Sequence, residues 1–367
     1  MQSLHALSRV LIDDDALRAA ECDPALQRQL WDLAVDHFAH LCLAWRLGES
    51  RASWSGKFQR QARAALADAA VLEEMQRREL LRLTAAFRRA GIDLLLLKGA
   101  ALAYQVYPLP MLRSRDDTDL FIRVADRQRA AALLVDLGYD PAAENSAELA
   151  TAQRHFLRTE ATRFEHPVDL HWRVTNPLAY ADALPFDRAW SRSVEISRLD
   201  GARGLCRVDA LLLACLHRLA HHGDDSSLIW IYDINQLAGG FGKEDWSDLV
   251  VQAAANGLSG GSQQGLARAA DLFGTPVPAA IGASLLAATR PAEGAFFGAR
   301  VTPLRMLVSD WRALDTWGSR LRLLSAHLFP EPAYMVSKYG TRNRALLPLL
   351  YARRALAGLP RWLAGWR

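Results

Sequence analysis

Residues 92–124, with the sequence IDLLLLKGAALAYQVYPLPMLRSRDDTDLFIRV, constrain the fold more strongly than any other part of this chain. Four consecutive leucines at residues 94–97 form an apolar run that is too short for a membrane span, so the run predicts a buried strand. The sequence Lys98-Gly99-Ala100 ends that strand, and a short helix is expected to follow it. Pro108 and Pro110 end the helix, because proline has no N–H donor and disfavours helix in the preceding residue.

A second strand is expected over the segment DTDLFI, which begins at Asp117. Side chains two positions apart on a strand point to the same side, so Asp117 and Asp119 can converge on one point. Two carboxylates on one face of a mainly apolar strand are costly unless a cation neutralises them. A hard divalent ion such as Mg²⁺ binds carboxylate oxygens. The pattern therefore predicts a metal site at Asp117 and Asp119.

The composition is ordinary for a soluble globular protein, with 51% apolar and 23% charged residues among 367, enough for two or three domains. The formal net charge of +4 does not by itself indicate nucleic-acid binding, which requires a clustered basic stripe. Four cysteines form no CxxC pair and are expected to be reduced thiols. The first residues do not resemble a signal peptide, and no apolar run reaches spanning length, so we expect a cytoplasmic protein.

Residues 1–90 are expected to be helical, because alanine, leucine and arginine dominate and apolar positions recur at helical spacing. Gly91 follows two arginines, as is typical of a helix C-terminus. The seven-residue spacing of Trp31, Phe38 and Trp45 predicts that these rings lie on one face of one helix.

From residue 91 to about residue 200 the pattern is mixed, with a helix expected over residues 125–137 and a strand in the segment HPVDLHWRV. In this strand Val168 and Leu170 alternate with Asp169 and His171. If the apolar residues face the core, Asp169 lies on the opposite side, where it supplies a third carboxylate to the predicted site. The alternative is a structural ion pair of Asp169 with Arg163 or Arg173.

These residues carry a resemblance to a known family. The order Lys98-Gly99-Ala100, then Asp117-x-Asp119, then Asp-Leu-His-Trp from Asp169 resembles the uncharacterised nucleotidyltransferase family of the DNA polymerase beta-like superfamily. The likeness covers roughly residues 90–240. It implies a short mixed sheet flanked by helices, two Mg²⁺ ions and an NTP. It also implies that Asp117, Asp119 and Asp169 bind the metals and carry the catalysis.

The chemistry of nucleotidyl transfer accounts for such a set of residues. Two cations about 3.5–4 Å apart can stabilise both the attacking and the leaving oxygen of the transfer. A glycine turn at Gly99 lets backbone N–H groups approach phosphates at a helix start, and Lys98, Arg113 and Arg115 offset the triphosphate charge. The superfamily commonly has Gly-Ser or Gly-Gly where this chain has Gly99-Ala100, so no serine hydroxyl is available there to a phosphate. The alternatives without a role in phosphate binding are that Lys98 is a surface lysine and that Arg113 and Arg115 form ordinary ion pairs.

Residues 201–330 are expected to be helical again, with Asp209 as the N-cap of a leucine-rich helix over residues 210–220. His217 and His221 have the spacing of zinc ligands on a helix, but the glutamate that the HExxH pattern requires is an arginine here, so we expect packed histidines. A second possibility is that His217 closes over the nucleotide. The run NGLSGGSQQG at residues 256–265 predicts a flexible loop.

The C-terminal segment from residue 341 interleaves leucines and tryptophans with Arg353, Arg354, Arg361 and Arg367. Such a basic amphipathic segment can lie on a membrane surface, dock on a partner protein or pack on its own domain.

We therefore expect an α+β fold with a small mixed-sheet nucleotidyltransferase core flanked by helical N- and C-terminal regions. The expected division is residues 1–90, 91–200 (catalytic core), 201–330 (helical) and 331–367 (tail). The expected reaction is transfer of an NMP from an NTP to an unidentified acceptor (a small molecule, a peptide or tRNA) with release of pyrophosphate. A non-catalytic nucleotide-binding or scaffold protein, or a toxin-like transferase that modifies protein or tRNA, remains an alternative.

Overall fold

The computed structural model describes residues 2–50, 52–142, 152–175, 177–222, 227–291, 293, 303–330, 332–341 and 343–363. The N-terminal region is helical, as predicted. Its helices are α1 (Gln2–Ile12), α2 (Asp14–Ala19), α3 (Pro24–Asp36), α4 (His40–Glu49) and the long α5 (Gly56–Arg89). Gly91 follows α5 with a positive φ of 63°, the left-handed conformation that glycine adopts readily after a helix.

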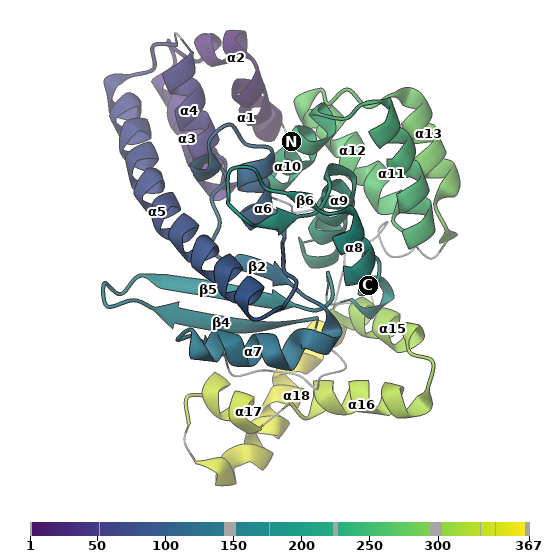
Figure 1. The fold of residues 1–367 in the computed structure, drawn as a ribbon. Helices are drawn as coiled ribbons and strands as arrows, with labels where there is room; N and C mark the ends of the chain where they lie inside the picture. The colour runs from purple at the N-terminus through teal and green to yellow at the C-terminus, as the bar shows by residue number, and fades with distance from the viewer. Residues whose placement is uncertain are drawn as a thin grey trace.

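A mixed sheet lies at the centre of the molecule (Figure 1). Its described strands are β1 (Leu95–Leu96), β2 (Thr118–Phe121), β3 (Asp140–Pro141), β4 (Gln153–Thr159), β5 (Glu165–His171), β6 (Val194–Glu195) and β7 (Arg203–Gly204), in the order β3-β4-β5-β2-β1-β7-β6. The pairs β2–β5 and β1–β7 are parallel, and the others are antiparallel. The strands come from the region predicted to be mixed, so the α+β prediction is confirmed.

The apolar residues of the central strands are buried on both faces of this sheet. On one face Leu120, Val168 and Leu170 pack with residues of α5 and of α7 (Arg127–Asp136). On the other face Leu95 and Phe121 join an apolar core that includes N-terminal helices and helices of residues 186–288. In Figure 1, α7 lies below the strands, whereas α1–α4 and the helices of residues 228–288 (α10–α13) lie above them. The N-terminal helices and the helices that follow the sheet therefore share one core on the side of the sheet that carries Phe121.

The second helical region follows the sheet. Its helices are α8 (Phe186–Arg192), α9 (Arg207–His222), α10 (Leu228–Gly239), α11 (Lys243–Asn256), α12 (Ser259–Phe273), α13 (Ala279–Ala288), α15 (Pro303–Ala313) and α16 (Trp317–Leu328). The short helix between β1 and β2 is α6 (Lys98–Gln105). None of the helices in the described part of the chain has the length and apolar character needed to cross a membrane.

Three local predictions are wrong. Trp31 lies in α3 and Trp45 in α4, because Phe38 has a left-handed backbone with a φ of 57° and separates the two helices. Asp209 lies inside the first turn of α9, which begins at Arg207, and its carboxylate accepts a hydrogen bond from Arg192.

The predicted loop at residues 256–265 is the third wrong prediction, because most of it forms the first half of α12. Its glycines and serines let the helix pack closely. A Cβ atom at Gly265 would lie 2.5 Å from Sγ of Cys215, so this position in the helix requires glycine. The small residues are therefore a packing feature and not a sign of flexibility.

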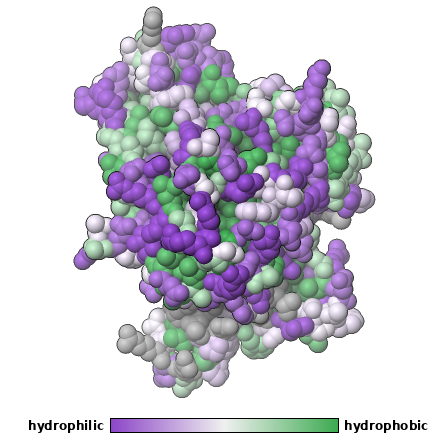
Figure 2. Space-filling view, viewed as in Figure 1, coloured by the Kyte–Doolittle hydropathy of each residue, from purple (hydrophilic) through white to green (hydrophobic). Residues whose placement is uncertain are grey.

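The C-terminal tail forms α17 (Pro332–Lys338) and α18 (Leu347–Leu363). The hydroxyl of Tyr351 donates a 2.6 Å hydrogen bond to the carbonyl of Pro330, so α18 contacts its own chain. Leu349 and Leu356 are 68% and 71% exposed. Arg367 and the side chain of Arg361 lie outside the described part of the chain. On the face shown in Figure 2, hydrophilic residues surround separate apolar patches.

Candidate functional site

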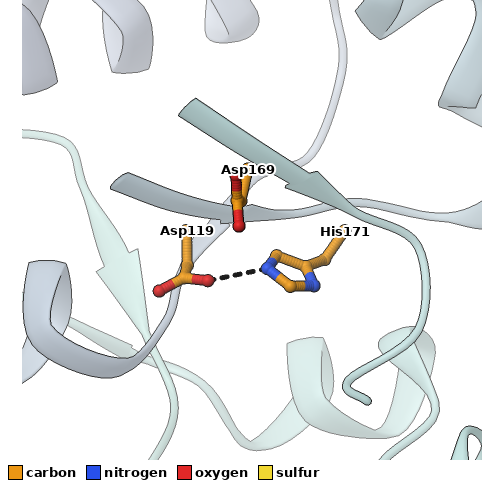
Figure 3. A group of neighbouring side chains, drawn as sticks. All are labelled: Asp119, Asp169 and His171. Atoms are coloured by element: carbon orange, nitrogen blue, oxygen red, sulfur yellow. Dashed lines mark hydrogen bonds and ion pairs between the residues drawn. The ribbon is translucent and has the colours of Figure 1, made fainter. Parts of the chain in front are cut away.

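The neighbouring strands β2 and β5 bring three polar side chains together. They run parallel in a register that pairs Asp119 with Asp169 and Phe121 with His171. Because Leu170 faces the apolar layer, Asp169 and His171 lie on the opposite face, as the alternation predicted. The ligand atoms of Asp119, Asp169 and His171 all lie within 4.8 Å of one another (Figure 3). This buried group could hold a metal ion.

Asp119 is the best-connected member of this group. Its Oδ1 atom accepts hydrogen bonds from Nζ of Lys98 and from Nε2 of His171, each at 2.7 Å. Burial alone would raise the pKa of Asp119, but Lys98 and His171 outweigh burial and hold that pKa well below its usual range. Asp119 is therefore a charged carboxylate at neutral pH, although it is only 3% exposed.

Lys98 reaches Asp119 through an unusual backbone conformation. It is the first residue of α6 and has a φ of 48°, in the left-handed region that residues other than glycine rarely adopt. Burial disfavours the charged form of Lys98, but the carboxylates of Asp119, Asp117 and Asp169 overcome this effect and raise its pKa. The lysine is thus a half-buried cation beside the acids.

Asp169 is held from the other side, by β4. Its Oδ1 atom lies 2.5 Å from Nδ1 of His155, and its Oδ2 accepts a 2.9 Å hydrogen bond from Gln153. Arg173, which the sequence offered as an alternative partner, instead pairs with Asp182. Asp169 is buried, whereas the side chain of His155 is 58% exposed. The side of the site next to β4 is therefore accessible to solvent.

Asp117 lies just before β2, at an exposed position beside the buried group. Partial loss of hydration beside the site and the negative charges of Asp119 and Asp169 raise the pKa of Asp117 to about 6. Its carboxylate is outside the set of three residues whose ligand atoms lie within 4.8 Å of one another. The structure therefore places the predicted Asp117 next to the group and His171 within it.

A cavity of about 260 Å³ opens beside the acids. Most of the residues predicted to bind nucleotide line it, namely Lys98, Gly99, Arg113 and Arg115, together with Asp117 and Asp119. Ala100 instead packs in the apolar layer that includes Leu120. A Cβ atom at Gly99 would lie 3.4 Å from Nη1 of Arg113, at ordinary contact distance, so the turn lies directly against this arginine.

Both arginines of the cavity are paired with acids of distant helices. Arg113 is buried and forms a 2.8 Å ion pair with Asp233 of α10. Arg115 forms a 2.8 Å ion pair with Glu73 of α5. Tyr107 also donates a hydrogen bond to Asp233. The ion pairs fix the loop that leads to Asp117, while both side chains still border the cavity.

Three residues of the site, His171, Gln153 and His155, were not predicted from the sequence to belong to it. His171 lies two residues from Asp169 on a strand already predicted to alternate, so the signal for a shared face was present. Gln153 and His155 alternate with Phe156 and its neighbours on β4, but only the antiparallel pairing of β4 with β5 places them beside Asp169.

None of the curated proteins is matched by this chain. A crystal structure of an antigenic nucleotidyltransferase-like protein from Paracoccidioides brasiliensis is similar with 15% sequence identity and a TM-score of 0.36, over 61% of this chain and 97% of that one. The model of the family described as "Uncharacterised nucleotidyltransferase" matches residues 23–274, which include the sheet, the acids and the cavity. The chain therefore belongs to the uncharacterised nucleotidyltransferase family.

Proposed function

We propose that this protein is a metal-dependent nucleotidyltransferase that moves an NMP from an NTP to an acceptor and releases pyrophosphate. The observation that carries the proposal is the register of β2 and β5, which pairs Asp119 with Asp169 beside the half-buried Lys98. Buried carboxylates at this spacing are costly unless cations neutralise them, and Lys98 supplies only one positive charge. Membership of the nucleotidyltransferase family and the excess of negative charge at Asp119 and Asp169 both support a metal-dependent nucleotidyl transfer.

The donor set fits a divalent cation. Carboxylate oxygens of Asp119, Asp169 and Asp117 suit Mg²⁺, the ion expected from the sequence, whereas the imidazole of His171 also suits transition metals. When bound, two such ions would offset negative charge on the attacking and leaving oxygens of the transfer. The protein contributes the fixed positions of these carboxylates on two adjacent strands.

The remaining residues of the site have separate roles in the proposed reaction. Lys98 and Gly99 line the cavity at the start of α6, and Lys98 with the N–H groups of this first turn would bind phosphate oxygens of the NTP. Leu97, at the N-cap position of α6, makes no side-chain hydrogen bond to this turn. Arg113 and Arg115 border the cavity, each already paired with an acid, and are the arginines predicted to contact the triphosphate. Asp169 lies on the open side with His155, where an acceptor hydroxyl would approach.

The test uses NTPs labelled at the α-phosphate, incubated with the protein, Mg²⁺ and a cell extract. Transfer of the α-label to an acceptor, without transfer of a γ-label, is the expected result and distinguishes nucleotidyl from phosphoryl transfer. Asp169→Ala should abolish labelling but keep most NTP binding. Asp187→Asn, at an exposed carboxylate that pairs with Arg123, is the matched control. NTP binding without labelling by the wild-type protein would favour the scaffold alternative.

A further inference from the structure

The cavity beside the acids has a second, apolar half. Beyond Lys98 and the acids, its wall consists of aliphatic and aromatic side chains from α6, α9 and α10, with Phe38 from the turn between α3 and α4. These residues include Leu102, Leu213, Ala214, His217, Ile229 and Trp230. The reaction site described above uses none of them, so this half needs a separate explanation.

Two aromatic rings are held at this end by contacts between distant segments. Trp230 is half-buried on α10, and the ring of His217 packs edge-on against it with 5.8 Å between centroids. Phe38 remains 43% exposed. The N–H of Ile229 donates a 3.3 Å hydrogen bond to the carbonyl of His37, which ties the turn carrying Phe38 to the start of α10. The rings are therefore positioned before any ligand arrives.

The charged groups of the cavity wall are partly paired. Asp233 forms an ion pair with Arg113 and accepts a hydrogen bond from the hydroxyl of Tyr107. Lys98 pairs with Asp119, and Asp117 lines the same cavity. A ligand that uses the whole wall therefore carries charged groups as well as a flat apolar surface. A nucleotide has this combination, with its phosphates at one end and its base at the other.

Size and access separate the nucleotide from the acceptor. Pockets for drug-sized ligands measure about 300–1,000 Å³, and the cavity of about 260 Å³ lies just below this range, so it suits a group the size of a nucleotide base. Asp169, the carboxylate assigned to the acceptor, does not line this cavity. It lies instead beside the exposed His155 of β4. The acceptor thus has its own approach, which leaves the cavity to the NTP.

We propose that the apolar half of the cavity binds the base of the NTP, with Trp230 and Phe38 as the rings against which the base packs. This inference rests on the proposed function for the identity of the ligand. Base–aromatic stacking contributes about 1–3 kcal/mol per base, which corresponds to roughly 5- to 150-fold in affinity. The base would therefore set much of the nucleotide affinity, and the acids and Lys98 would set the phosphate affinity.

The experiment compares the binding of two probes, Mg²⁺-NTP and Mg²⁺-tripolyphosphate, by isothermal titration calorimetry. Trp230→Ala should weaken NTP binding roughly 5- to 150-fold and leave tripolyphosphate binding unchanged. Trp230→Phe keeps a ring and should restore most of the NTP affinity. Trp317→Ala, at a residue 69% exposed on α16, is the matched control and should change neither value.

A second measurement separates this inference from the proposed function. Saturation-transfer NMR with free nucleosides should show contact of the base protons with the wild-type protein and with Asp119→Asn, but not with Trp230→Ala. Nucleoside binding without any nucleotidyl transfer would refute the proposed function and keep the base site. Nucleotidyl transfer with unchanged NTP affinity in both Trp230→Ala and Phe38→Ala would overturn the base site and keep the function. Absence of both nucleoside and NTP binding would overturn both.

Discussion

The Nζ atom of Lys98 lies 2.7 Å from Oδ1 of Asp119, although the lysine starts a helix and the aspartate lies 21 residues later on a strand. Lys98 has a left-handed backbone where the chain passes from β1 into α6. Non-glycine residues in this conformation cost about 1–3 kcal/mol, and such strain is concentrated at functional sites. The lysine is therefore held where it offsets part of the carboxylate charge.

The two acids of the Asp-x-Asp pair should respond differently to loss of charge. Asp119→Asn leaves the half-buried Lys98 without its ion-pair partner, so the free energy of unfolding should fall by about 3 kcal/mol. Asp117→Asn removes repulsion with Asp119 and Asp169 at an exposed position, so it should stabilise the protein by up to about 1 kcal/mol. Urea unfolding in the presence of a chelator measures both values. Equal changes in the free energy of unfolding would contradict the different environments assigned to Asp117 and Asp119. Both substitutions should abolish nucleotidyl transfer.

His171 should control metal affinity. Its Nε2 atom contacts Asp119, so it either binds the ion or orients the carboxylate that does. His171→Ala should weaken Mn²⁺ binding about 10- to 100-fold, as measured by electron paramagnetic resonance of the free ion. Nitrogen coupling in the spectrum of bound Mn²⁺ would identify His171 as a ligand, and its absence would identify an orienting role. Unchanged Mn²⁺ affinity would exclude both roles.

Glu79 should make stability depend on pH in the acidic range. Burial would raise its pKa, but hydrogen bonds from Arg82, Tyr139 and Arg158 lower it from 4.5 to about 2. Because the folded-state pKa is depressed, this stabilisation is complete above pH 4.5 and is lost as the pH falls towards 2.

The matched variant for this prediction is Glu79→Gln, which removes a buried charge between two arginines. It should lower the free energy of unfolding by about 3 kcal/mol at pH 7, and the difference from wild type should shrink below pH 4.5. Urea unfolding between pH 3 and pH 7 tests this. A difference that stays constant over that range would show that the charge of Glu79 is not responsible.

Two helix glycines provide a paired test of packing. A Cβ atom at Gly265 would meet Cys215 at 2.5 Å and Ile234 at 3.2 Å, so Gly265→Ala should destabilise the protein by about 1–3 kcal/mol. Gly282 of α13 has no atom within 4 Å of the same position, so Gly282→Ala should stabilise it by about 1 kcal/mol through helix propensity. Thermal unfolding of both variants gives the sign of each change in stability. Destabilisation by Gly282→Ala would show that helix propensity does not determine the effect at this position.

The sequence by itself determined the character of the elements. The leucine run before Lys98 and the alternation of Asp169 with Val168 and Leu170 depend on local periodicity, so the strands and the faces of their side chains could be predicted. The helical regions before Gly91 and after Arg207 follow from the same local signals. The division into domains at residues 90, 200 and 330 stays a prediction.

The tertiary structure decided which side chains meet. His155, Glu73 and Asp233 are far in sequence from the residues that they contact, and only strand pairing and helix packing bring them to Asp169, Arg115 and Arg113. Local rules also failed at Phe38 and Gly265, because backbone conformation and close helix contact determine structure there. Periodicity is a property of neighbouring residues, whereas the charge balance of the site is a sum over groups that only the folded chain assembles.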